Sequence, residues 1–188
     1  WKTTNCCSAS TTWTPVDDWM ANLAISSLIV DPTNANVMYA GTGEGFGNAD
    51  GIRGAGVFKS SDGGTTWSQL ASTNGSAWYY VNRLAISPNG TTLLAATNTN
   101  LLRSTDGGVS WQAKLNGTIQ DVKFDPSNSA NAIATAKDVA FYSTDGGANW
   151  SAATGLPTSG RKELAYAPSN PATVYVSMED GAIFKSTD

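Results

Sequence analysis

The chain has 188 residues, of which 40% are hydrophobic and 14% are charged, and this composition indicates a folded protein. Its net charge of −4 and the lack of any basic run argue against nucleic-acid binding and against an anionic membrane partner, and no apolar run approaches the roughly 20 residues that span a bilayer. The sequence has no histidine, which removes the usual serine or cysteine triads and most zinc sites, so we expect neither a metal nor a cofactor.

One short motif recurs along the chain and sets its organisation. It reads Ser, any residue, Asp, Gly, Gly, two further residues and Trp, and complete copies occupy residues 60–67, 104–111 and 143–150. A fourth copy begins at residue 186 and stops at the chain end. A degenerate copy opens the chain, with Lys2-Thr3-Thr4-Asn5 as its start and Thr12-Trp13 as its end. A spacing of about 40–45 residues is typical of a propeller blade.

Between the motifs, in chain order, one pattern of four strands repeats. An alternating apolar strand runs into a proline-containing turn, and a second strand follows. The third strand leads into the motif and the fourth leaves it through Trp. The first strands contain Leu28 and Val30, Leu84 and Ile86, Val122 and Phe124, and Leu164 and Tyr166. We therefore expect an all-β chain with repeats at about 1–26 (partial), 27–70, 81–115, 119–155 and 162–188 (truncated).

The motif resembles the Asp-box, or BNR, repeat of sialidases, sortilin-type receptors, xyloglucanases and photosystem-assembly propellers. This resemblance covers essentially the whole chain, and it implies a β-propeller of four-stranded antiparallel blades. Because propellers with this repeat usually close about six to eight blades, and about four repeats are present, we expect a segment of a larger propeller. The alternative is a closed four-bladed ring, in which the strand at residues 12–16 completes the blade begun by residues 162–186.

The start of the chain carries two further signals. Trp1 is not an initiator methionine, and residues 1–20 lack the charged start and apolar middle of a signal peptide. We expect a piece of a longer or processed polypeptide that is secreted or held in the cell envelope, with any export signal outside this chain. Cys6 and Cys7 are adjacent, so they cannot link distant segments. A vicinal disulfide and two free thiols both remain open, and the specific geometry of disulfides favours the thiols.

The motif residues, called the boxes below, are expected to hold turns rather than to perform chemistry. The Asp carboxylate can accept the N–H groups of its own turn, the glycines permit positive φ, and the Trp ring should be largely buried. Carboxylates on separate blades are also too dispersed for a glycosidase pair. The residues assigned to this structural role are Ser60, Asp62, Gly64, Trp67, Ser104, Asp106, Gly108, Trp111, Ser143, Asp145, Gly147, Trp150, Ser186 and Asp188. We assign no catalytic residue.

Function is expected where the repeat is interrupted. Residues 43–55 form a long insertion between the second and third strands, and the connections on either side of this repeat are rich in aromatic residues. Strand direction places all three segments on the face opposite the boxes. The candidate ligand-binding residues are Trp19, Glu44, Phe46, Asp50, Arg53, Trp78, Tyr79 and Tyr80. Packing between blades is the competing interpretation of the aromatic residues, and Trp78 is expected to have an exposed ring if it binds ligand.

Two function classes follow. The first is a non-catalytic extracellular or envelope module that binds a glycan or a protein and contacts further blades of the same polypeptide. The alternative is a fragment of a glycoside hydrolase, sialidase-like or xyloglucanase-like, whose catalytic residues lie largely outside this chain. The sialidase resemblance would require an arginine triad, and no Arg-Ile-Pro or Arg-Leu-Pro signature occurs. Residues 12–19 look somewhat like the opening of a xyloglucanase, but residues 40–44 lack the expected Asp. We favour the binding module.

Overall fold

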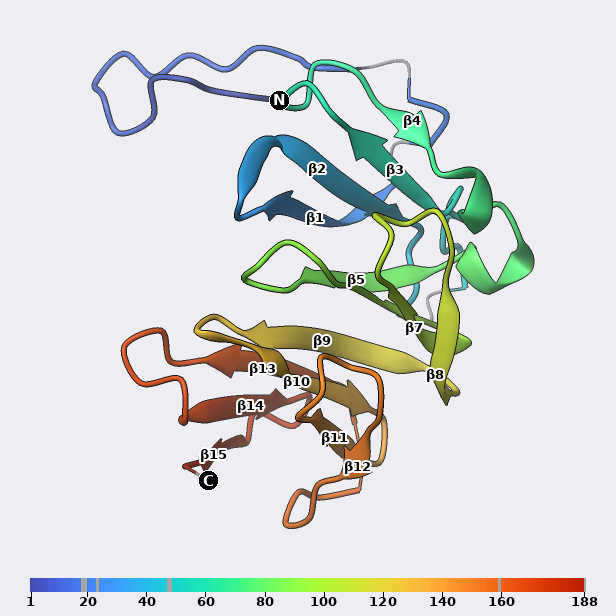
Figure 1. The fold of residues 1–188 in the computed structure, drawn as a ribbon, viewed down its shortest axis with the longest axis vertical. Helices are drawn as coiled ribbons and strands as arrows, with labels where there is room; N and C mark the ends of the chain where they lie inside the picture. Colours follow the sequence, from blue (N-terminus) through green and yellow to red (C-terminus); the bar gives the residue numbers. More distant parts are fainter. Residues whose placement is uncertain (18–19, 23, 47–48, 159, 188) are drawn as a thin grey trace.

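The structure is a computed structural model that describes residues 1–17, 20–22, 24–46, 49–158 and 160–187. Within those residues the chain forms a stack of antiparallel sheets, three of four strands and one of three (Figure 1). Each sheet takes its strands in sequence order, as propeller blades do. We number the sheets blade 1 to blade 4 along the chain. The predicted all-β fold of antiparallel blades is confirmed, and blade 4 differs in having three strands within the described residues.

Blade 1 comprises β1 (Ile25–Asp31), β2 (Asn34–Thr42), β3 (Val57–Ser60) and β4 (Ser68–Gln69). Blade 2 comprises β5 (Val81–Ile86), β6 (Leu93–Thr97), β7 (Asn100–Ser104) and β8 (Gln112–Asn116). Blade 3 comprises β9 (Ile119–Asp125), β10 (Asn128–Ala136), β11 (Ala140–Ser143) and β12 (Ser151–Ala152), and blade 4 comprises β13 (Lys162–Tyr166), β14 (Val174–Met178) and β15 (Ile183–Ser186). Two short 3-10 turns, η1 (Ala71–Thr73) and η2 (Ser76–Trp78), join blades 1 and 2.

The boxes share one face of the stack with the turns between the first and second strands. In all four blades the turns between the first and second strands lie on the same side, at the left of Figure 1. Blade 3 shows how such a turn forms: Asp125 Oδ1 accepts the Ser127 N–H at 2.8 Å, which fixes the reversal predicted from its Asp-Pro sequence. The box of the same blade lies against this end, because the Gly146 N–H donates to the Ala130 carbonyl at 2.7 Å. We call this the box face.

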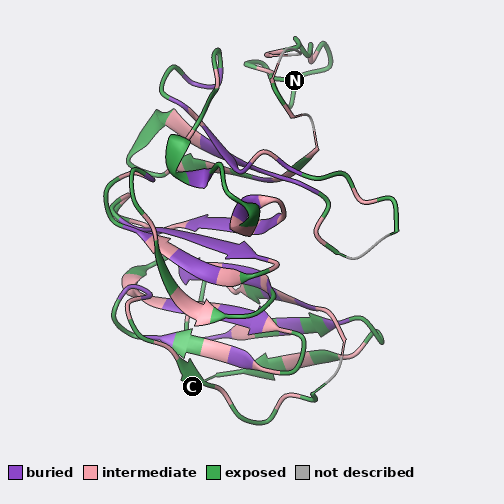
Figure 2. Ribbon diagram, turned by 90° about the vertical axis from the view of Figure 1, so that its right-hand side faces the viewer, coloured by how far each residue is buried: buried purple, intermediate pink, exposed green. Residues whose placement is uncertain are grey.

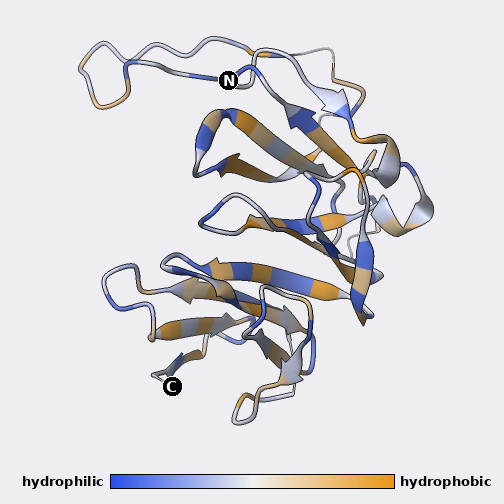
Figure 3. Cartoon of the chain, in the orientation of Figure 1, coloured by the Kyte–Doolittle hydropathy of each residue, from blue (hydrophilic) through white to orange (hydrophobic). Residues whose placement is uncertain are grey.

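The core lies between neighbouring blades. Buried apolar residues of blades 1 and 2 form one cluster and those of blades 2 and 3 form another, and the buried segments concentrate in the middle of the stack (Figure 2). Figure 3 shows the alternation of hydrophobic and hydrophilic residues along these strands. Leu84 in blade 2 is 3% exposed, whereas Leu28, at the same strand position in blade 1, is 60% exposed. The difference arises because blade 1 covers Leu84, so each blade depends on its neighbour for burial.

Polar contacts also join successive blades. The cationic residue that precedes the first box residue, Ser or Thr, donates to the first glycine carbonyl of the next box: Lys2 Nζ to Gly63 O at 2.8 Å, and Arg103 Nε to Gly146 O at 2.8 Å. The first strands are linked in the same manner, since Asn82 Nδ2 donates to the Ile119 carbonyl at 2.7 Å. Repeated side-chain contacts of this kind fix the register of one blade against the next.

The degenerate first copy has the geometry of a box. Lys2 pairs with Thr14 in an isolated antiparallel bridge, as Lys59 pairs with Ser68 in blade 1. Asn5 replaces the box Asp, and its Oδ1 accepts the Thr12 N–H at 3.0 Å. Thr14 therefore pairs within its own segment and does not complete blade 4. The two termini lie at opposite ends of an open stack (Figure 1), so the alternative of a closed four-bladed ring is wrong.

Candidate functional site

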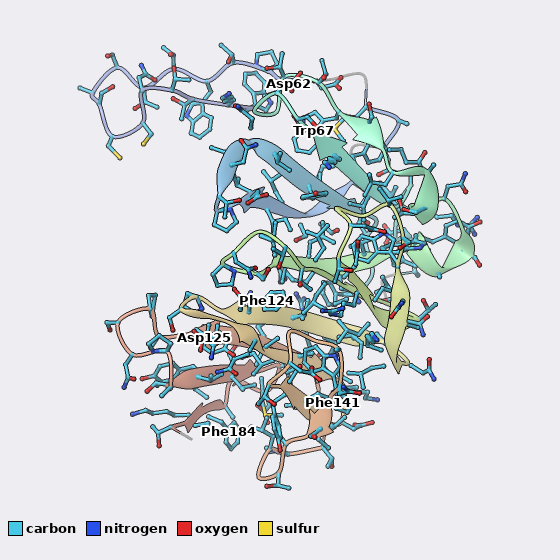
Figure 4. All side chains as sticks on the ribbon, viewed as in Figure 1. Asp62, Trp67, Phe124, Asp125, Phe141 and Phe184 are labelled. Atoms are coloured by element: carbon cyan, nitrogen blue, oxygen red, sulfur yellow. The ribbon has the colours of Figure 1, made fainter. Side chains whose placement is uncertain are left out.

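The box of blade 1 is a self-contained turn. The Asp62 carboxylate accepts the Thr65 and Thr66 N–H groups, both at 2.9 Å, and the Ser60 hydroxyl at 2.8 Å. These bonds, led by the Thr66 N–H, lower the pKa of Asp62 to about 2. Asp62 and Trp67 lie beside the N-terminal segment in Figure 4. The carboxylate is solvent-exposed, but its hydrogen bonds go to its own turn, as expected of a structural residue.

The other two complete boxes repeat this arrangement. Asp106 accepts the Ser110 hydroxyl at 2.5 Å and its N–H at 2.9 Å, and Asp145 accepts the Asn149 N–H at 2.9 Å. These bonds lower the pKa of each carboxyl to about 2. The second box glycines have positive φ and donate to the box serine hydroxyls at 2.9 Å; they are Gly64, Gly108 and Gly147.

The box tryptophans pack over their own turns. Each indole N–H donates to the carbonyl of the second box glycine, at 3.0–3.2 Å, in the residues Trp67, Trp111 and Trp150. All three residues are partly buried, and Trp111 and Trp150 pack against the interblade clusters of buried residues. Each ring lies over the second glycine of its own turn. Ser186 of the last copy is exposed, and Asp188 lies outside the described residues.

Two of the three segments predicted to meet opposite the boxes do meet, and Asp18 and Trp19 of the third lie outside the described residues. The Gly54 N–H donates to the Tyr79 carbonyl at 2.7 Å, which joins the 43–55 insertion to the connection before β5. The insertion also contacts the residues before β1, since the Gly43 N–H donates to the Ala24 carbonyl at 2.8 Å. Both connections lie at the right of Figure 1, away from the first-strand turns. We call this side the connection face.

The aromatic residues of that face are mostly packed. The Trp78 ring is 5% exposed and contacts Trp111 edge-on, with ring centroids 4.9 Å apart. The expectation of an exposed, ligand-binding Trp78 is therefore wrong, because η2 turns the ring into the core between blades 1 and 2. Tyr79 and Tyr80 are half-buried and accept backbone bonds through their carbonyls. Phe46 is 43% exposed.

The charged candidates Glu44 and Arg53 make contacts that hold the 43–55 insertion in place. Glu44 Oε2 accepts the Ile52 N–H at 3.2 Å, inside the same loop. The Arg53 guanidinium lies over the Tyr79 ring at 4.4 Å. Asp50 is exposed and is not among the described residues that line the groove introduced next. Trp19 lies outside the described residues.

A groove of about 640 Å³ opens on the connection face. It lies between segments of all four blades: the start of the insertion, the connections after β6, β10 and β14, and the starts of β9 and β13. Its lining residues are Gly45, Phe46, Asn98, Thr118, Gln120, Lys137, Gly160, Arg161, Glu163, Ser177, Met178 and Glu179. Of the predicted binding residues, only Phe46 contributes to it.

Ion pairs organise one wall of the groove. Arg161 binds Glu163 through Nε at 2.9 Å and Nη2 at 2.5 Å, and its guanidinium also lies 3.5 Å from the centroid of the Phe46 ring. Arg83 Nη2 binds the other Glu163 oxygen at 2.7 Å. Glu163 is thus held between two guanidinium groups, one from blade 2 and one from the residue that precedes β13. The stacking of Arg161 on Phe46 ties blade 4 to the insertion of blade 1.

A buried carboxylate lies behind this wall. Asp121 is fully buried, contacts Arg83 Nε at 3.2 Å, and accepts the Val122 and Leu164 N–H groups, both at 2.8 Å. Burial raises the pKa of Asp121, although Lys123, the Leu164 N–H and Arg83 oppose the shift. Its hydrogen bonds link the first strands of blades 3 and 4. Asp121 therefore has an interblade structural role and is not accessible to a ligand in the groove.

Sequence reasoning missed most of the groove residues because, apart from Gly45, they lie outside the insertion that interrupts the repeat. A usable signal existed in the first strands. Ser27, Arg83, Asp121 and Glu163 all immediately precede the apolar residue that begins the alternating pattern. Polar residues at one position of successive first strands indicate side chains directed toward one another along the stack. Comparing these positions would have found the ion-pair network of Arg83, Asp121 and Glu163.

Among the described residues, no group of three or more acidic or cysteine side chains is arranged to hold a metal ion. None of the helical segments in the described ranges is long and apolar enough to cross a membrane.

Comparisons with known proteins identify the repeat and the fold. The BNR/Asp-box repeat family matches residues 141–152. An ancestral GH74 enzyme superimposes with a TM-score of 0.74 at 25% identity, covering 95% of this chain and 24% of that chain. A GH74 xyloglucanase from Xanthomonas campestris gives a TM-score of 0.63 at 20% identity, covering 87% and 24%. YCF48 bound to a D1 peptide gives 0.60 at 18% identity, covering 96% and 55%. A search of curated proteins found no match.

These similarities show a BNR/Asp-box β-propeller arrangement that resembles the propellers of GH74 enzymes. The xyloglucanase and YCF48 matches show the fold alone. The chain spans about a quarter of the length of the GH74 structures and about half of YCF48.

Proposed function

We propose that this chain forms part of a non-catalytic, glycan-binding β-propeller, located outside the cell or in the cell envelope. The groove on the connection face is its proposed binding site, and the observation that carries the proposal is the composition of that groove. The half-exposed Phe46 ring lines the groove together with the neutral hydrogen-bonding side chains Asn98, Thr118, Gln120 and Ser177. An aromatic ring flanked by amides and hydroxyls suits the apolar face and the hydroxyl groups of a sugar.

The charges in the groove also favour an uncharged polar ligand. Two cations, Lys137 and Arg161, face two carboxylates, Glu163 and Glu179, so the formal charge of the lining is balanced. Arg161 and Glu163 already neutralise each other. A strongly anionic or cationic ligand would meet repulsion from one member of each pair, whereas a neutral glycan would not.

A glycoside hydrolase fragment is the second candidate, supported by the similarity to GH74 enzymes. Hydrolysis needs an accessible carboxyl that holds a proton near neutral pH, beside a second carboxylate. Among the described residues these properties are separated. Asp121 has a raised pKa but is fully buried, and Glu163 is accessible but held in two arginine pairs. Binding is therefore the better reading of this groove.

Calorimetric titration with xyloglucan oligosaccharides and cello-oligosaccharides tests the proposal. We expect the wild-type chain to bind at least one of them, and Phe46→Ala to weaken binding roughly three- to tenfold, since an aromatic contact contributes about 0.5–1.5 kcal/mol. Gln120→Ala should weaken it by a similar factor. Tyr142→Ala is the matched control, because Tyr142 is 48% exposed, close to the 43% of Phe46, and does not line the groove.

Three outcomes would contradict the proposal. If neither oligosaccharide binds, a glycan of this kind is excluded as the ligand. If Phe46→Ala and Tyr142→Ala lose the same amount of affinity, the groove is excluded as the binding site. Release of new reducing ends from xyloglucan by the purified chain would favour the hydrolase. An unstructured peptide of mixed composition is included in the titration because YCF48 was solved with a peptide, and preferential binding of that peptide would replace the glycan by a protein partner.

A further inference from the structure

The two cysteines occupy the glycine positions of the degenerate box. Cys6 and Cys7 follow Asn5 as Gly63 and Gly64 follow Asp62. In the complete box both glycines have positive φ, 70° and 85°. Cys7 keeps this feature with φ of 67°, and it is the single non-glycine residue with positive φ in the described residues. A residue with a side chain rarely adopts this conformation, so the turn imposes it.

Hydrogen bonds around the cysteines hold this turn. Asn5 Nδ2 donates to the Ser10 carbonyl at 3.0 Å, and the Thr12 N–H donates to Asn5 Oδ1 at 3.0 Å. The Thr11 hydroxyl donates to the Ser8 carbonyl at 2.8 Å. The base of the hairpin is closed by paired backbone bonds between Lys2 and Thr14 at 2.8 and 2.9 Å. The backbone around the cysteines is therefore fixed from both sides.

This turn brings the two thiols into contact. The Cys6 and Cys7 sulfur atoms are 3.4 Å apart, and both residues are exposed, free thiols. A disulfide bond is about 2.05 Å long, so the sulfurs, now 3.4 Å apart, need to approach by roughly 1.4 Å to bond. Exposure gives a small reagent access to either sulfur, and contact makes the second thiol the nearest nucleophile to any adduct on the first.

We propose that Cys6 and Cys7 form a reversible redox site that low-molecular-weight disulfides oxidise to a vicinal disulfide. The thiolate of one cysteine attacks a sulfur of the small disulfide RSSR, forming a mixed disulfide and releasing RS⁻, which takes up a proton. The neighbouring thiolate then attacks the protein sulfur of the mixed disulfide and releases the second RS⁻. In sum, the protein dithiol and RSSR give the vicinal disulfide and two RSH, with two electrons passing from the protein to the small disulfide.

The site lies at a contact between repeats. Lys2, whose backbone closes the same hairpin, donates through Nζ to the Gly63 carbonyl in the box of blade 1. Oxidation would close a small ring in the loop that this hairpin carries, so it would modify the part of the chain that packs on blade 1. The site is independent of the groove, because neither cysteine lines it.

Intact-mass analysis after incubation with oxidised glutathione tests the proposal. The sequence contains no other cysteine, so every change in thiol number belongs to this pair. We expect the wild-type chain to lose the mass of two hydrogen atoms, to resist alkylation by iodoacetamide, and to regain two alkylatable thiols after dithiothreitol. Cys6→Ser and Cys7→Ser are matched controls that keep one thiol each. Both should instead retain one glutathionyl group, because no neighbouring thiol can displace it.

Three results would overturn the proposal: wild-type protein that retains one or two glutathionyl groups, wild-type protein that forms a disulfide-linked dimer, or wild-type thiols that remain alkylatable while both single-cysteine variants react. Each would show that the neighbouring thiol does not complete the exchange.

Discussion

Replacing Trp78 by Ala separates packing from ligand binding on the connection face. The ring is 5% exposed and contacts Trp111 edge-on at 4.9 Å, within the cluster between blades 1 and 2. Removing a buried Trp side chain costs about 3–5 kcal/mol, which in a chain of this size lowers the melting temperature by roughly 6–20 °C. Urea and thermal unfolding, followed by tryptophan fluorescence and circular dichroism, measure both quantities.

The same substitution at an exposed tryptophan is the control. Trp13 is 58% exposed, so Trp13→Ala should change the unfolding free energy by less than about 0.5 kcal/mol. A double-mutant cycle with Trp111→Ala should give a coupling energy of about 0.5–1.5 kcal/mol for the ring pair. A loss below about 1 kcal/mol in Trp78→Ala, or equal losses at positions 78 and 13, would refute the assignment of Trp78 to the core.

Two further predictions concern the boxes and glycine positions. Hydrogen bonds lower the pKa of Asp106 from 3.8 to about 2, so the stability that they add is present above pH 3.8 and is lost as the pH falls toward 2. Between pH 5 and pH 2, the urea midpoint of Asp106→Asn should therefore fall less than that of the wild type. Parallel pH curves for the two proteins would contradict this. Gly147→Ala should cost about 2–4 kcal/mol, because φ is 79° and a Cβ would lie 2.8 Å from Leu94 Cδ2. Gly155→Ala, with φ of 88° and nothing within 4 Å, should cost only about 1–2 kcal/mol, and equal costs in the urea assay would exclude the Leu94 contact as a cause.

The sequence was sufficient to predict the features that depend on hydrogen bonds between residues close together in the chain. A box aspartate accepts hydrogen bonds from residues three and four positions later, so the motif alone predicts the turn. In the degenerate copy, Asn5 accepts the N–H of Thr12, seven positions later, because the turn carries an insertion. Strand alternation and repeat spacing predicted the blades, and strand direction predicted that the 43–55 insertion meets the connection before β5.

Burial of individual side chains on the connection face could not be predicted in this way. Trp78 and Phe46 were both candidate ligand contacts, and both lie in segments that depart from the repeat. The structure buries Trp78 against Trp111 and leaves Phe46 43% exposed. The choice depends on η2, which rotates one ring into the gap between blades, and no local pattern in the sequence encodes that rotation.

By itself, the sequence determined the all-β class, the repeat, the structural role of the boxes and the face on which the connections gather, because each depends on periodicity or on bonds inside one turn. The groove and its charged wall were decided by the tertiary structure alone. The Arg161 guanidinium lies 3.5 Å from the centroid of the Phe46 ring although blades 2 and 3 separate the two residues in the chain, and Glu163 meets Arg83 across blade 3. Such contacts depend on how far each blade turns relative to the last, which is set by packing summed over every interblade contact rather than by any one segment.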